Sequence, residues 1–272
     1  MRMKRSAEME FADKVVWITG ASSGIGEALA YGFSTKGARL ILSSRNESEL
    51  LRVKQNCKGA PEKSVILPFD LERTGAMPDI ATKGIAAFGA IDILVNNGGI
   101  SQRSLVRDTV MDVDERIMRI NYLGQVALTK AVLPHMIEKQ SGHIVVVSSI
   151  MGVMATPLRS AYCASKHALH GFFDALRAEV WKDNISVTIV CPASIKTGIS
   201  INALTGSGQQ HGKMDPRQAA GMPPDVCAEQ IIHAVKKGRE QLVIGPPIKH
   251  VVLLKRFAPG LFSMIIRRAK VT

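Results

Sequence analysis

Short apolar runs rich in β-branched residues alternate along this chain with longer segments whose apolar residues recur at the helical period. Runs of this length are typical of buried strands, and apolar spacings of three and four residues are typical of helices. The strands that the pattern predicts span 14–19, 38–43, 64–68, 91–95, 143–148, 185–191 and 241–244. The helices that it predicts span 27–36, about 111–138, 160–182 and 223–237. This alternation predicts an α/β fold, a single Rossmann-like doubly wound parallel sheet of about seven strands with helices on both faces.

A chain of 272 residues with 46% hydrophobic content can bury a sizeable core, as one large α/β domain or as two small ones. We predict one domain because no linker divides the chain. We expect this domain to span residues 1–245. Within it, residues 198–221 are polar and glycine-rich and follow neither period, which is typical of a substrate lid. Residues 246–272 form a basic and apolar C-terminal extension of the same domain.

The cysteines and the N-terminus indicate a cytoplasmic protein without a metal site. The four cysteines stand far apart, without the paired spacing of a disulfide framework or a zinc cluster; they are Cys57, Cys163, Cys191 and Cys227. The first residues are basic but lead into Ala7-Glu8-Met9-Glu10 instead of an apolar core, so we expect neither a secretory signal nor a membrane span there.

The net charge of +12 raises the question of nucleic-acid binding. The cations are spread over predicted helix faces without the interleaved aromatic residues of a nucleic-acid groove, so no nucleic-acid partner is expected. Residues 245–272 differ, because they combine six cations with apolar residues and contain no carboxylate.

A glycine-rich turn separates the first predicted strand from the first predicted helix. Residues 20–26 read Gly-Ala-Ser-Ser-Gly-Ile-Gly. A strand, a glycine turn and a helix together aim free backbone N–H groups and the positive end of a helix dipole at a phosphate. The spacing G-x-x-x-G-x-G differs from the common G-x-G-x-x-G pattern, and a simple turn is the alternative.

The end of the second predicted strand favours NADP(H) over NAD(H). A carboxylate about twenty residues past the glycine loop would bind a ribose 2′-hydroxyl, but this chain has Ser44 and Arg45 there. An arginine binds a 2′-phosphate through charge-assisted hydrogen bonds, whereas a carboxylate repels it. The alternative for Arg45 is a solvated surface residue.

Two further strand ends carry polar residues. Asp70 follows the third predicted strand and can accept a hydrogen bond from an adenine amine or cap a helix before Leu71. The fourth strand leads into Asn96-Asn97-Gly98-Gly99, where amide side chains can tie neighbouring backbone while glycines leave room for a cofactor. An ordinary turn is the alternative there.

A phenol and an ammonium are expected to meet on the helix predicted for 160–182. Tyr162 and Lys166 lie one turn apart, so they share a helix face. A neighbouring cation stabilises a phenolate and lowers its pKa towards the neutral range, where the phenol can exchange protons. Ser149, at the end of the fifth strand, can hold a substrate oxygen beside the phenol. The alternative is an incidental Tyr/Lys pair on a helix. For Asn121, in the long predicted helix, the alternative to a functional role is a polar surface residue.

These groups all fall at the carboxyl ends of the predicted strands, where ligands bind in doubly wound sheets. Their order and spacing resemble the short-chain dehydrogenase/reductase family over residues 14 to about 245. The motifs are T-G-A-S-S-G-I-G at 19–26, N-N-G-G at 96–99, Asn121, Ser149, Y-C-A-S-K at 162–166 and Pro192 to Thr197.

The resemblance implies a role for each of these residues. Tyr162 would be the general acid/base, Lys166 would lower its pKa and hold the nicotinamide ribose, and Ser149 would orient the carbonyl. Asn121 would support a water relay to Lys166, and the backbone around Ile195 would bind the carboxamide. The expected cofactor contacts are Gly20, Ser22, Ser23, Gly24, Ile25, Gly26, Ser44, Arg45, Asp70, Leu71, Asn97, Gly98, Tyr162, Lys166, Pro192, Ile195 and Thr197.

Two positions depart from the family pattern. Gly98-Gly99 stands where the family usually has Ala-Gly, and Pro192-Ala193 where it usually has Pro-Gly; both affect fine cofactor geometry. The combination of the motifs N-N-G-G-I-S-Q-R-S and Y-C-A-S-K-H-A-L resembles the dehydrogenase/reductase member 7 subgroup. Relatives in this subgroup reduce steroid, retinoid and other lipophilic carbonyls.

The sequence therefore predicts an NADP(H)-dependent oxidoreductase that interconverts a carbonyl and an alcohol on a lipophilic small molecule by hydride transfer. The alternative is an NADP(H)-binding sensor or scaffold without turnover, which an intact Ser/Tyr/Lys set argues against. We expect a homodimer or homotetramer.

The C-terminal extension has two readings. Its apolar runs at 251–254 and 261–266 are separated by Ala258-Pro259-Gly260 and are each too short to span a bilayer. Cations bracket them, as expected of a segment that lies in a membrane interface. The alternative is a cover over the substrate cleft or a dimer contact. We expect Pro246-Pro247 to stop the seventh strand.

Overall fold

The computed structural model describes residues 9–245 and 248–268 and confirms the predicted α/β class. A seven-stranded sheet with the order β3-β2-β1-β4-β5-β6-β7 runs through its centre, and every neighbouring pair is parallel. The strands are β1 (Val15–Thr19), β2 (Arg39–Ser43), β3 (Ser64–Ile66), β4 (Ile93–Asn96), β5 (Gly142–Val147), β6 (Ile185–Pro192) and β7 (Gln241–Ile244).

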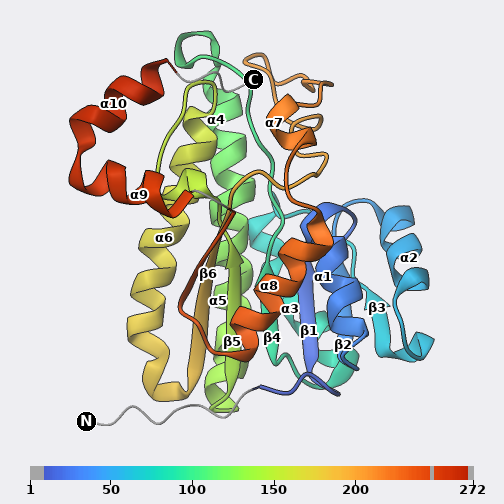
Figure 1. Ribbon diagram of the computed structural model, residues 1–272. Coiled ribbons are helices and arrows are strands. Elements are labelled where there is room, and N and C mark those ends of the chain that lie inside the picture. The colour runs from blue at the N-terminus through green and yellow to red at the C-terminus, as the bar shows by residue number, and fades with distance from the viewer. Residues whose placement is uncertain (1–8, 246–247, 269–272) are drawn as a thin grey trace.

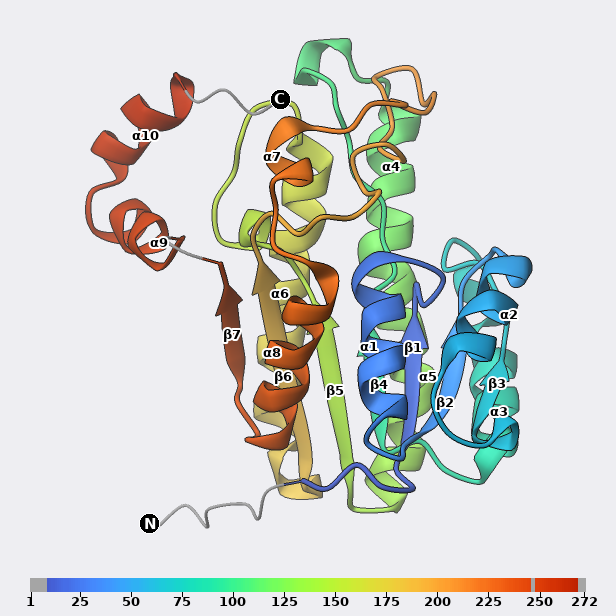
Figure 2. The same ribbon diagram turned by 45° about the vertical axis from the view of Figure 1, so that its right-hand side comes forward.

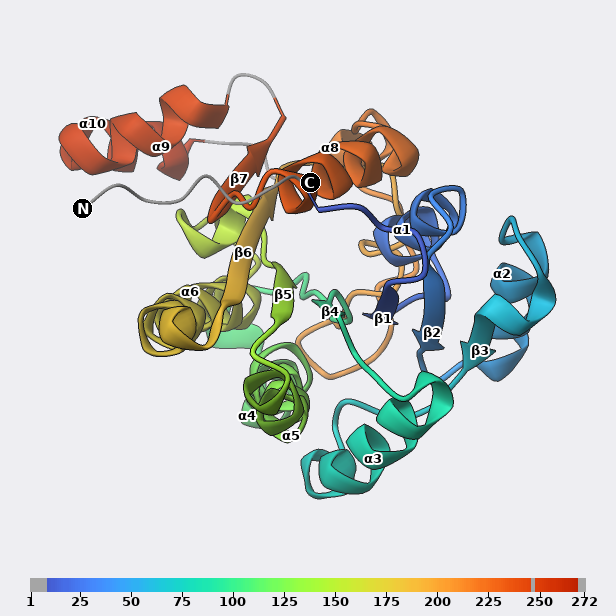
Figure 3. The same ribbon diagram turned by 90° about the horizontal axis from the view of Figure 1, so that it is seen from below.

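Helices cover both faces of this sheet (Figures 1 and 3). One face carries α1 (Gly24–Ser34), α2 (Glu47–Asn56) and α8 (Pro224–Lys236). The other carries α3 (Met77–Phe88), α4 (Met111–Met118), α5 (Gly124–Glu138) and α6 (Ser160–Val180). Each face buries its own apolar cluster against the sheet. The strands are apolar on both sides because both sides are covered, which explains their continuous apolar runs.

The long helix predicted for 111–138 is wrong as a single regular helix. A π-helical segment (Arg119–Leu123) lies between α4 and α5. The Asn121 side chain in this segment is fully buried, so Asn121 is not a polar surface residue. Single π turns of this kind are frequent at functional sites.

Other boundaries move by a few residues. Helix α1 begins at Gly24 and ends at Ser34 instead of spanning 27–36, because the last glycines of the loop already form its first turn. Helices α2 and α3, which follow β2 and β3, are additional to the helices that the pattern predicted. The third strand is shorter than predicted and ends at Ile66.

Residues 198–221 lie above the carboxyl ends of the strands (Figure 2). They were predicted to contain no helix, but they include α7 (Pro216–Ala219). Isolated bridges join Leu204 to Gln102 and to Gln210. Ser200, Ala203, Leu204 and Asp215 are buried, so the segment is packed onto the domain despite its polar composition.

The C-terminal extension forms two helices, α9 (Ile248–Phe257) and α10 (Pro259–Arg267), beyond β7. Buried Phe262 packs with Ile150 and Met154 of the segment before α6, so α10 is anchored to the domain. The stop predicted at Pro246-Pro247 lies outside the described residues.

We expect Gly26→Ala to destabilise the fold. A Cβ at position 26 would lie 2.1 Å from the Gly20 carbonyl oxygen and 2.6 Å from Asn97 Nδ2, so the loop would have to shift, at a cost of about 1–3 kcal/mol in unfolding free energy. Gly171→Ala is the matched control, because its Cβ would meet nothing within 4 Å on α6. Urea unfolding should show a loss for the first variant and a gain of about 0.5–1 kcal/mol for the second; equal stabilities would contradict the close approach.

Candidate functional site

Strands β1 and β4 are neighbours in the sheet, but the chain leaves them towards opposite edges. A hydrogen-bonded corner holds their carboxyl ends together. Thr19 Oγ1 accepts hydrogen bonds from the N–H groups of Asn97 and Gly98 at 3.0 and 3.1 Å. Asn97 Nδ2 donates to the carbonyl oxygens of Thr19 and Gly20 at 3.0 and 3.2 Å. The amide side chain thus ties neighbouring backbone, as predicted for this turn.

Two cavities open above this corner. The larger, of about 1260 Å³, lies over the glycine loop. The smaller, of about 430 Å³, lies over the carboxyl end of β5. Both are lined by Ile25, Asn97, Gly99, Thr197 and Ile199, so they adjoin.

Most predicted cofactor contacts line the larger cavity. They are Gly20, Ser22, Ser23, Gly24, Ile25, Ser44, Arg45, Asp70, Leu71, Asn97, Gly98 and Thr197. Tyr162, Lys166, Pro192 and Ile195 line the smaller one. Gly26 lines neither cavity and lies beneath the loop, where a Cβ would collide with Gly20. The residues predicted to contact the cofactor therefore line two adjoining cavities, except Gly26, which packs beneath the glycine loop.

The larger cavity fits a dinucleotide. Gly20 and Gly24 have φ values of +64° and +58°, which L side chains rarely adopt. A Cβ at position 24 would lie 2.9 Å from Thr197 Cγ2. The loop leads into α1, which begins at Gly24 beside the cavity. The free N–H groups at this end of the helix can stabilise an anion.

The larger cavity is also lined by Arg45, the residue predicted to bind a 2′-phosphate. Arg45 is half exposed, and its Nη1 lies 3.9 Å from Asp70 Oδ2. Asp70 Oδ1 accepts a hydrogen bond from the Glu72 N–H at 3.0 Å, so this carboxylate caps a turn and not a helix. Ser44 Oγ accepts a hydrogen bond from the Asn46 N–H at 3.1 Å.

The departure at Gly98 has a local cause. A Cβ at position 98 would lie 2.6 Å from Leu71 Cδ1. Leu71 is buried beside the cavity, so in this chain leucine occupies the space that an alanine side chain at position 98 would need.

Ser149, Tyr162 and Lys166 meet in the smaller cavity. Ser149 Oγ accepts a hydrogen bond from the Met151 N–H at 3.1 Å, and its hydroxyl is hydrogen-bonded to the Tyr162 phenol. Lys166 Nζ lies 5.8 Å from the Tyr162 ring centroid and donates to the Val147 carbonyl oxygen at 2.9 Å. The structure thus brings together the three groups from two elements, as predicted.

The electrostatics differ from the sequence-based expectation. Burial raises the pKa of the Tyr162 phenol above its ordinary value, while the hydrogen bond with Ser149 lowers it. Burial also lowers the pKa of the Lys166 ammonium to about 8. The expected lowering of the phenol pKa by Lys166 is therefore wrong for this structure, because the ammonium is directed to Val147 and burial dominates.

Asn121 is not in contact with either cavity among the described residues. Its Oδ1 accepts from the Ile100 N–H at 2.8 Å, and its Nδ2 donates to the Ile100 carbonyl oxygen at 2.9 Å and to Ser165 Oγ at 3.0 Å. The π segment turns this side chain inward, where it fixes the segment that follows Gly99.

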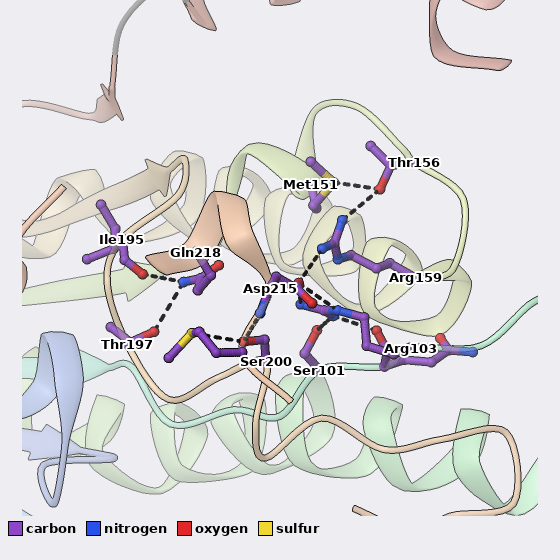
Figure 4. A network of polar contacts seen from close by, with 12 residues as sticks. Ser101, Arg103, Met151, Thr156, Arg159, Ile195, Thr197, Ser200, Asp215 and Gln218 are labelled. Carbon is purple, nitrogen blue, oxygen red and sulfur yellow. Dashed lines mark hydrogen bonds and ion pairs between the residues drawn. The ribbon is translucent and has the colours of Figure 1, made fainter. Parts of the chain in front are cut away.

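Sequence reasoning missed a buried ionic cluster in the wall of the smaller cavity (Figure 4). Asp215 Oδ2 accepts hydrogen bonds from Arg103 Nε and Nη2 at 2.9 and 2.6 Å, and from Arg159 Nη2 at 2.9 Å. Arg103 and Asp215 are 112 residues apart. The sequence signal for this cluster was weak. Arg103 lies in the Ser-Gln-Arg-Ser stretch after the glycine pair, and no periodicity marks Asp215 or Arg159.

Helix α7 joins this cluster to the cofactor side. Asp215 precedes its first residue, and Gln218 Nε2 donates to the Ile195 carbonyl oxygen and to Thr197 Oγ1, the latter at 3.3 Å. Figure 4 shows both sets of contacts around the same short helix. One turn of helix therefore lines the smaller cavity and also contacts Thr197, which lines both cavities.

The other wall of the smaller cavity is apolar. It contains Ile150, Met151 and Met154 from the segment after β5 and Ile265 and Ile266 from α10. The C-terminal extension therefore flanks the smaller cavity, as the interpretation of this segment as a cover over the substrate cleft predicted.

A parallel sheet with a glycine loop and a dinucleotide-sized cavity at its switch point defines a Rossmann-like nucleotide-binding protein. The family profile described as short chain dehydrogenase matches residues 14–207. The chain belongs to the short-chain dehydrogenase/reductase family and is an oxidoreductase of that family.

Curated relatives agree with this assignment, and a solved structure shares the fold. The chain is 52% identical over 262 residues to human dehydrogenase/reductase SDR family member 7, covering 94% of this chain and 77% of that protein. It is 44% identical over 263 residues to a Drosophila melanogaster dehydrogenase/reductase SDR family protein 7-like, covering 95% and 81%. A Burkholderia phymatum short chain dehydrogenase/reductase solved in complex with NAD has the same fold, with a TM-score of 0.82, 23% identity and coverage of 93% and 96%.

Proposed function

We propose that this oxidoreductase is an NADP(H)-dependent carbonyl reductase of lipophilic substrates, with Tyr162 as its general acid/base. The observation that carries the proposal is the meeting of Ser149, Tyr162 and Lys166 in a cavity that adjoins the glycine-loop cavity. When bound along the glycine loop, the nicotinamide cofactor would supply the hydride. The direct test is NADPH oxidation over a panel of aldehydes, quinones, steroids and retinoids; cofactor binding without turnover would favour a sensor instead.

The side chains support a proton donor at the carbonyl. Because burial raises the pKa of Tyr162, the phenol is held in its protonated form and can donate to a carbonyl oxygen. The Ser149 hydroxyl, already hydrogen-bonded to the phenol, would orient that oxygen. Arg103 and Arg159 act on Tyr162 in the direction that lowers its pKa, which stabilises the phenolate that remains after proton transfer.

The groups on the cofactor side support NADP(H). The half-exposed Arg45 side chain lines the larger cavity with Ser44, and a guanidinium can bind a 2′-phosphate. Lys166 would hold the nicotinamide ribose, and Ile195 would bind the carboxamide through its backbone. Asn121 would support the proton relay indirectly, through the segment after Gly99 that it fixes.

The segment 198–221 would serve as the lid of this site, which is supported by the residues that it contributes to the walls of both cavities. Expected cytoplasmic location and homo-oligomeric assembly remain predictions. No helix within residues 9–245 and 248–268 is long and apolar enough to cross a membrane.

The C-terminal helices would bind a membrane surface and give access to lipid-dissolved substrates. They expose the large apolar side chains of Leu253, Phe257, Leu261 and Met264, with Phe257 77% exposed. Arg256, Arg267 and Arg268 are exposed beside them. This combination suits a helix pair that inserts apolar side chains between anionic head groups.

Tyr162→Phe should lower turnover by about two to four orders of magnitude, because it removes a general acid while keeping the ring. NADPH affinity should change little, as measured by fluorescence titration. Tyr122→Phe is the matched control, since Tyr122 packs against Phe172 away from both cavities. Near-normal turnover of the Tyr162 variant would sink the proposed mechanism.

Arg45→Ala should weaken NADPH binding by about 1.5–3 kcal/mol, the worth of hydrogen bonds to a charged group, and leave NADH binding nearly unchanged. Arg39→Ala, at the opposite end of β2, should affect neither cofactor. If titrations show equal weakening of NADPH and NADH by Arg45→Ala, the arginine is structural and the NADP(H) assignment is wrong.

Sedimentation with liposomes tests the membrane proposal. The full-length protein should bind anionic vesicles more than neutral ones, and the double variant Phe257→Ser/Met264→Ser should lose most of that binding. The control Val106→Ser/Met111→Ser removes two similarly exposed apolar side chains elsewhere and should bind like the unchanged protein. Absence of binding, or equal binding by both double variants, would rule the membrane role out.

A further inference from the structure

Gln102 is fully buried, and both ends of its side-chain amide are hydrogen-bonded. Its Oε1 accepts a hydrogen bond from the Ala161 N–H at 3.0 Å, and its Nε2 donates to Thr109 Oγ1 at 2.9 Å. Gln102 does not belong to the walls of either cavity, so it cannot touch a molecule that is bound in them. The contacts of this buried amide therefore hold other parts of the chain in place.

The part of the chain that Gln102 holds is the beginning of α6. The first N–H groups of a helix have no acceptor within the helix and need one from elsewhere. Arg159, at the N-cap position of α6, cannot supply one from its side chain, because a guanidinium has only donors. Gln102 Oε1 supplies the acceptor at Ala161, the residue before Tyr162. A side chain 59 positions away thus caps the helix that carries the proposed general acid.

The chain enters α6 through a strained residue. Leu158 has a φ of +68°, in a region that bulky side chains rarely adopt. A residue persists in such a region only when the contacts around it fix its backbone. Here the Ser104 N–H donates a hydrogen bond to the Leu158 carbonyl oxygen at 3.1 Å. Residues 102–104 therefore hold the chain at Leu158 and at Ala161, on either side of the point where α6 begins.

The segment 198–221 supports the same region from the other side. The Leu204 N–H donates to the Ser101 carbonyl oxygen at 2.9 Å, and the Leu204 carbonyl oxygen accepts from the Arg103 N–H at 2.8 Å. The side chains of Leu204 and Ala161 belong to one small apolar cluster. Gln102 therefore lies in a backbone that is itself fixed, which makes its side chain a rigid support for the start of α6.

We propose that Gln102 is a positioning residue, which caps α6 and thereby fixes the Tyr162 phenol beside the Ser149 hydroxyl. This inference rests on the proposed carbonyl reductase function, because it concerns the placement of its general acid. Tyr162 lies in the first turn of α6, whereas Ser149 lies on the turn after β5. A shift of the helix start would therefore change the distance between the two hydroxyl groups, and a misplacement of about 1 Å can lower a rate about a hundredfold.

Gln102→Met tests this role, because methionine has a side chain of similar length and lacks both hydrogen-bonding groups. The assay uses the full-length protein with NADPH and with cinnamaldehyde or menadione as the carbonyl compound. The kcat should fall about ten- to a hundredfold. The KM for the carbonyl compound and the Kd for NADPH should change little, because Gln102 lines neither cavity. An unchanged kcat, or a loss that appears in KM alone, would overturn the proposal.

Two further variants separate positioning from stability. Gln102→Glu keeps an acceptor oxygen within reach of the Ala161 N–H, at a helix N-terminus that favours a negative group, and should restore part of the lost kcat. Met136→Ala removes a fully buried side chain beside Gly142, at the end of β5 away from Ser149. This control should lower the melting temperature and leave kcat and KM unchanged. Equal kcat values in folded Gln102→Met and Gln102→Glu would contradict the capping role.

Thr109→Val provides the test if Gln102→Met does not fold. This substitution removes the acceptor of Gln102 Nε2 and leaves Oε1 in place at Ala161, so the amide is held less firmly. The kcat should again fall while KM stays the same, by a smaller factor than a complete loss of the cap would cause. An unchanged kcat in this variant would then refute the proposal.

A spectroscopic measurement decides the role of Gln102 even if no carbonyl compound is turned over and the proposed function fails. The chain contains three tyrosines, so incorporation of fluorotyrosine gives three fluorine resonances, and Tyr162→Phe identifies that of Tyr162. Gln102→Met should shift or broaden this resonance. The resonances of Tyr31 on α1 and of Tyr122, which packs against Phe172 farther along α6, should stay in place. A stationary Tyr162 resonance, or equal shifts of all three, would refute the proposal.

Discussion

The close approach of β1 and β4 at their carboxyl ends determines where every functional group of this protein can lie. The two strands are adjacent, yet the chain continues from them to opposite edges of the sheet, so a crevice must open between the departing segments. Thr19 and Asn97 close the base of that crevice with hydrogen bonds, and the loop above it has no room for a side chain at Gly26. The two adjoining cavities follow from this geometry.

Sequence alone was sufficient wherever the signal was local. All seven strands, the glycine loop and the Tyr162/Lys166 pair were predictable, because a strand run, a turn and one helical turn each occupy a few consecutive residues. The π segment was not, because Asn121 turns inward to bind Ile100, a contact that no periodicity reveals. The Arg103–Asp215 pair joins positions 112 residues apart, and Asp215 lies in a polar, aperiodic stretch that predicted a lid and gave no sign of a buried ion pair.

The same distinction explains the pKa of Tyr162. Helical spacing correctly predicted that the Tyr162 phenol and the Lys166 ammonium share a helix face. If both groups were solvated, this spacing would have been enough to predict the direction of the pKa shift. Burial depends on what packs around them from elsewhere in the chain, and here it outweighs the effect of a neighbouring charge. The Lys166 ammonium is satisfied by the Val147 carbonyl, which is a product of the fold and not of the helix.

Helix α7 makes the two cavities mechanically dependent on each other. Asp215, at its N-terminus, binds Arg103 and Arg159, and Gln218, in its single turn, binds Ile195 and Thr197. A displacement of this short helix would therefore disturb the charged wall beside Tyr162 and the segment beside the glycine loop together. Since an ion pair this buried is costly to break, Asp215 firmly attaches the end of the segment 198–221 that carries α7 to the rest of the domain.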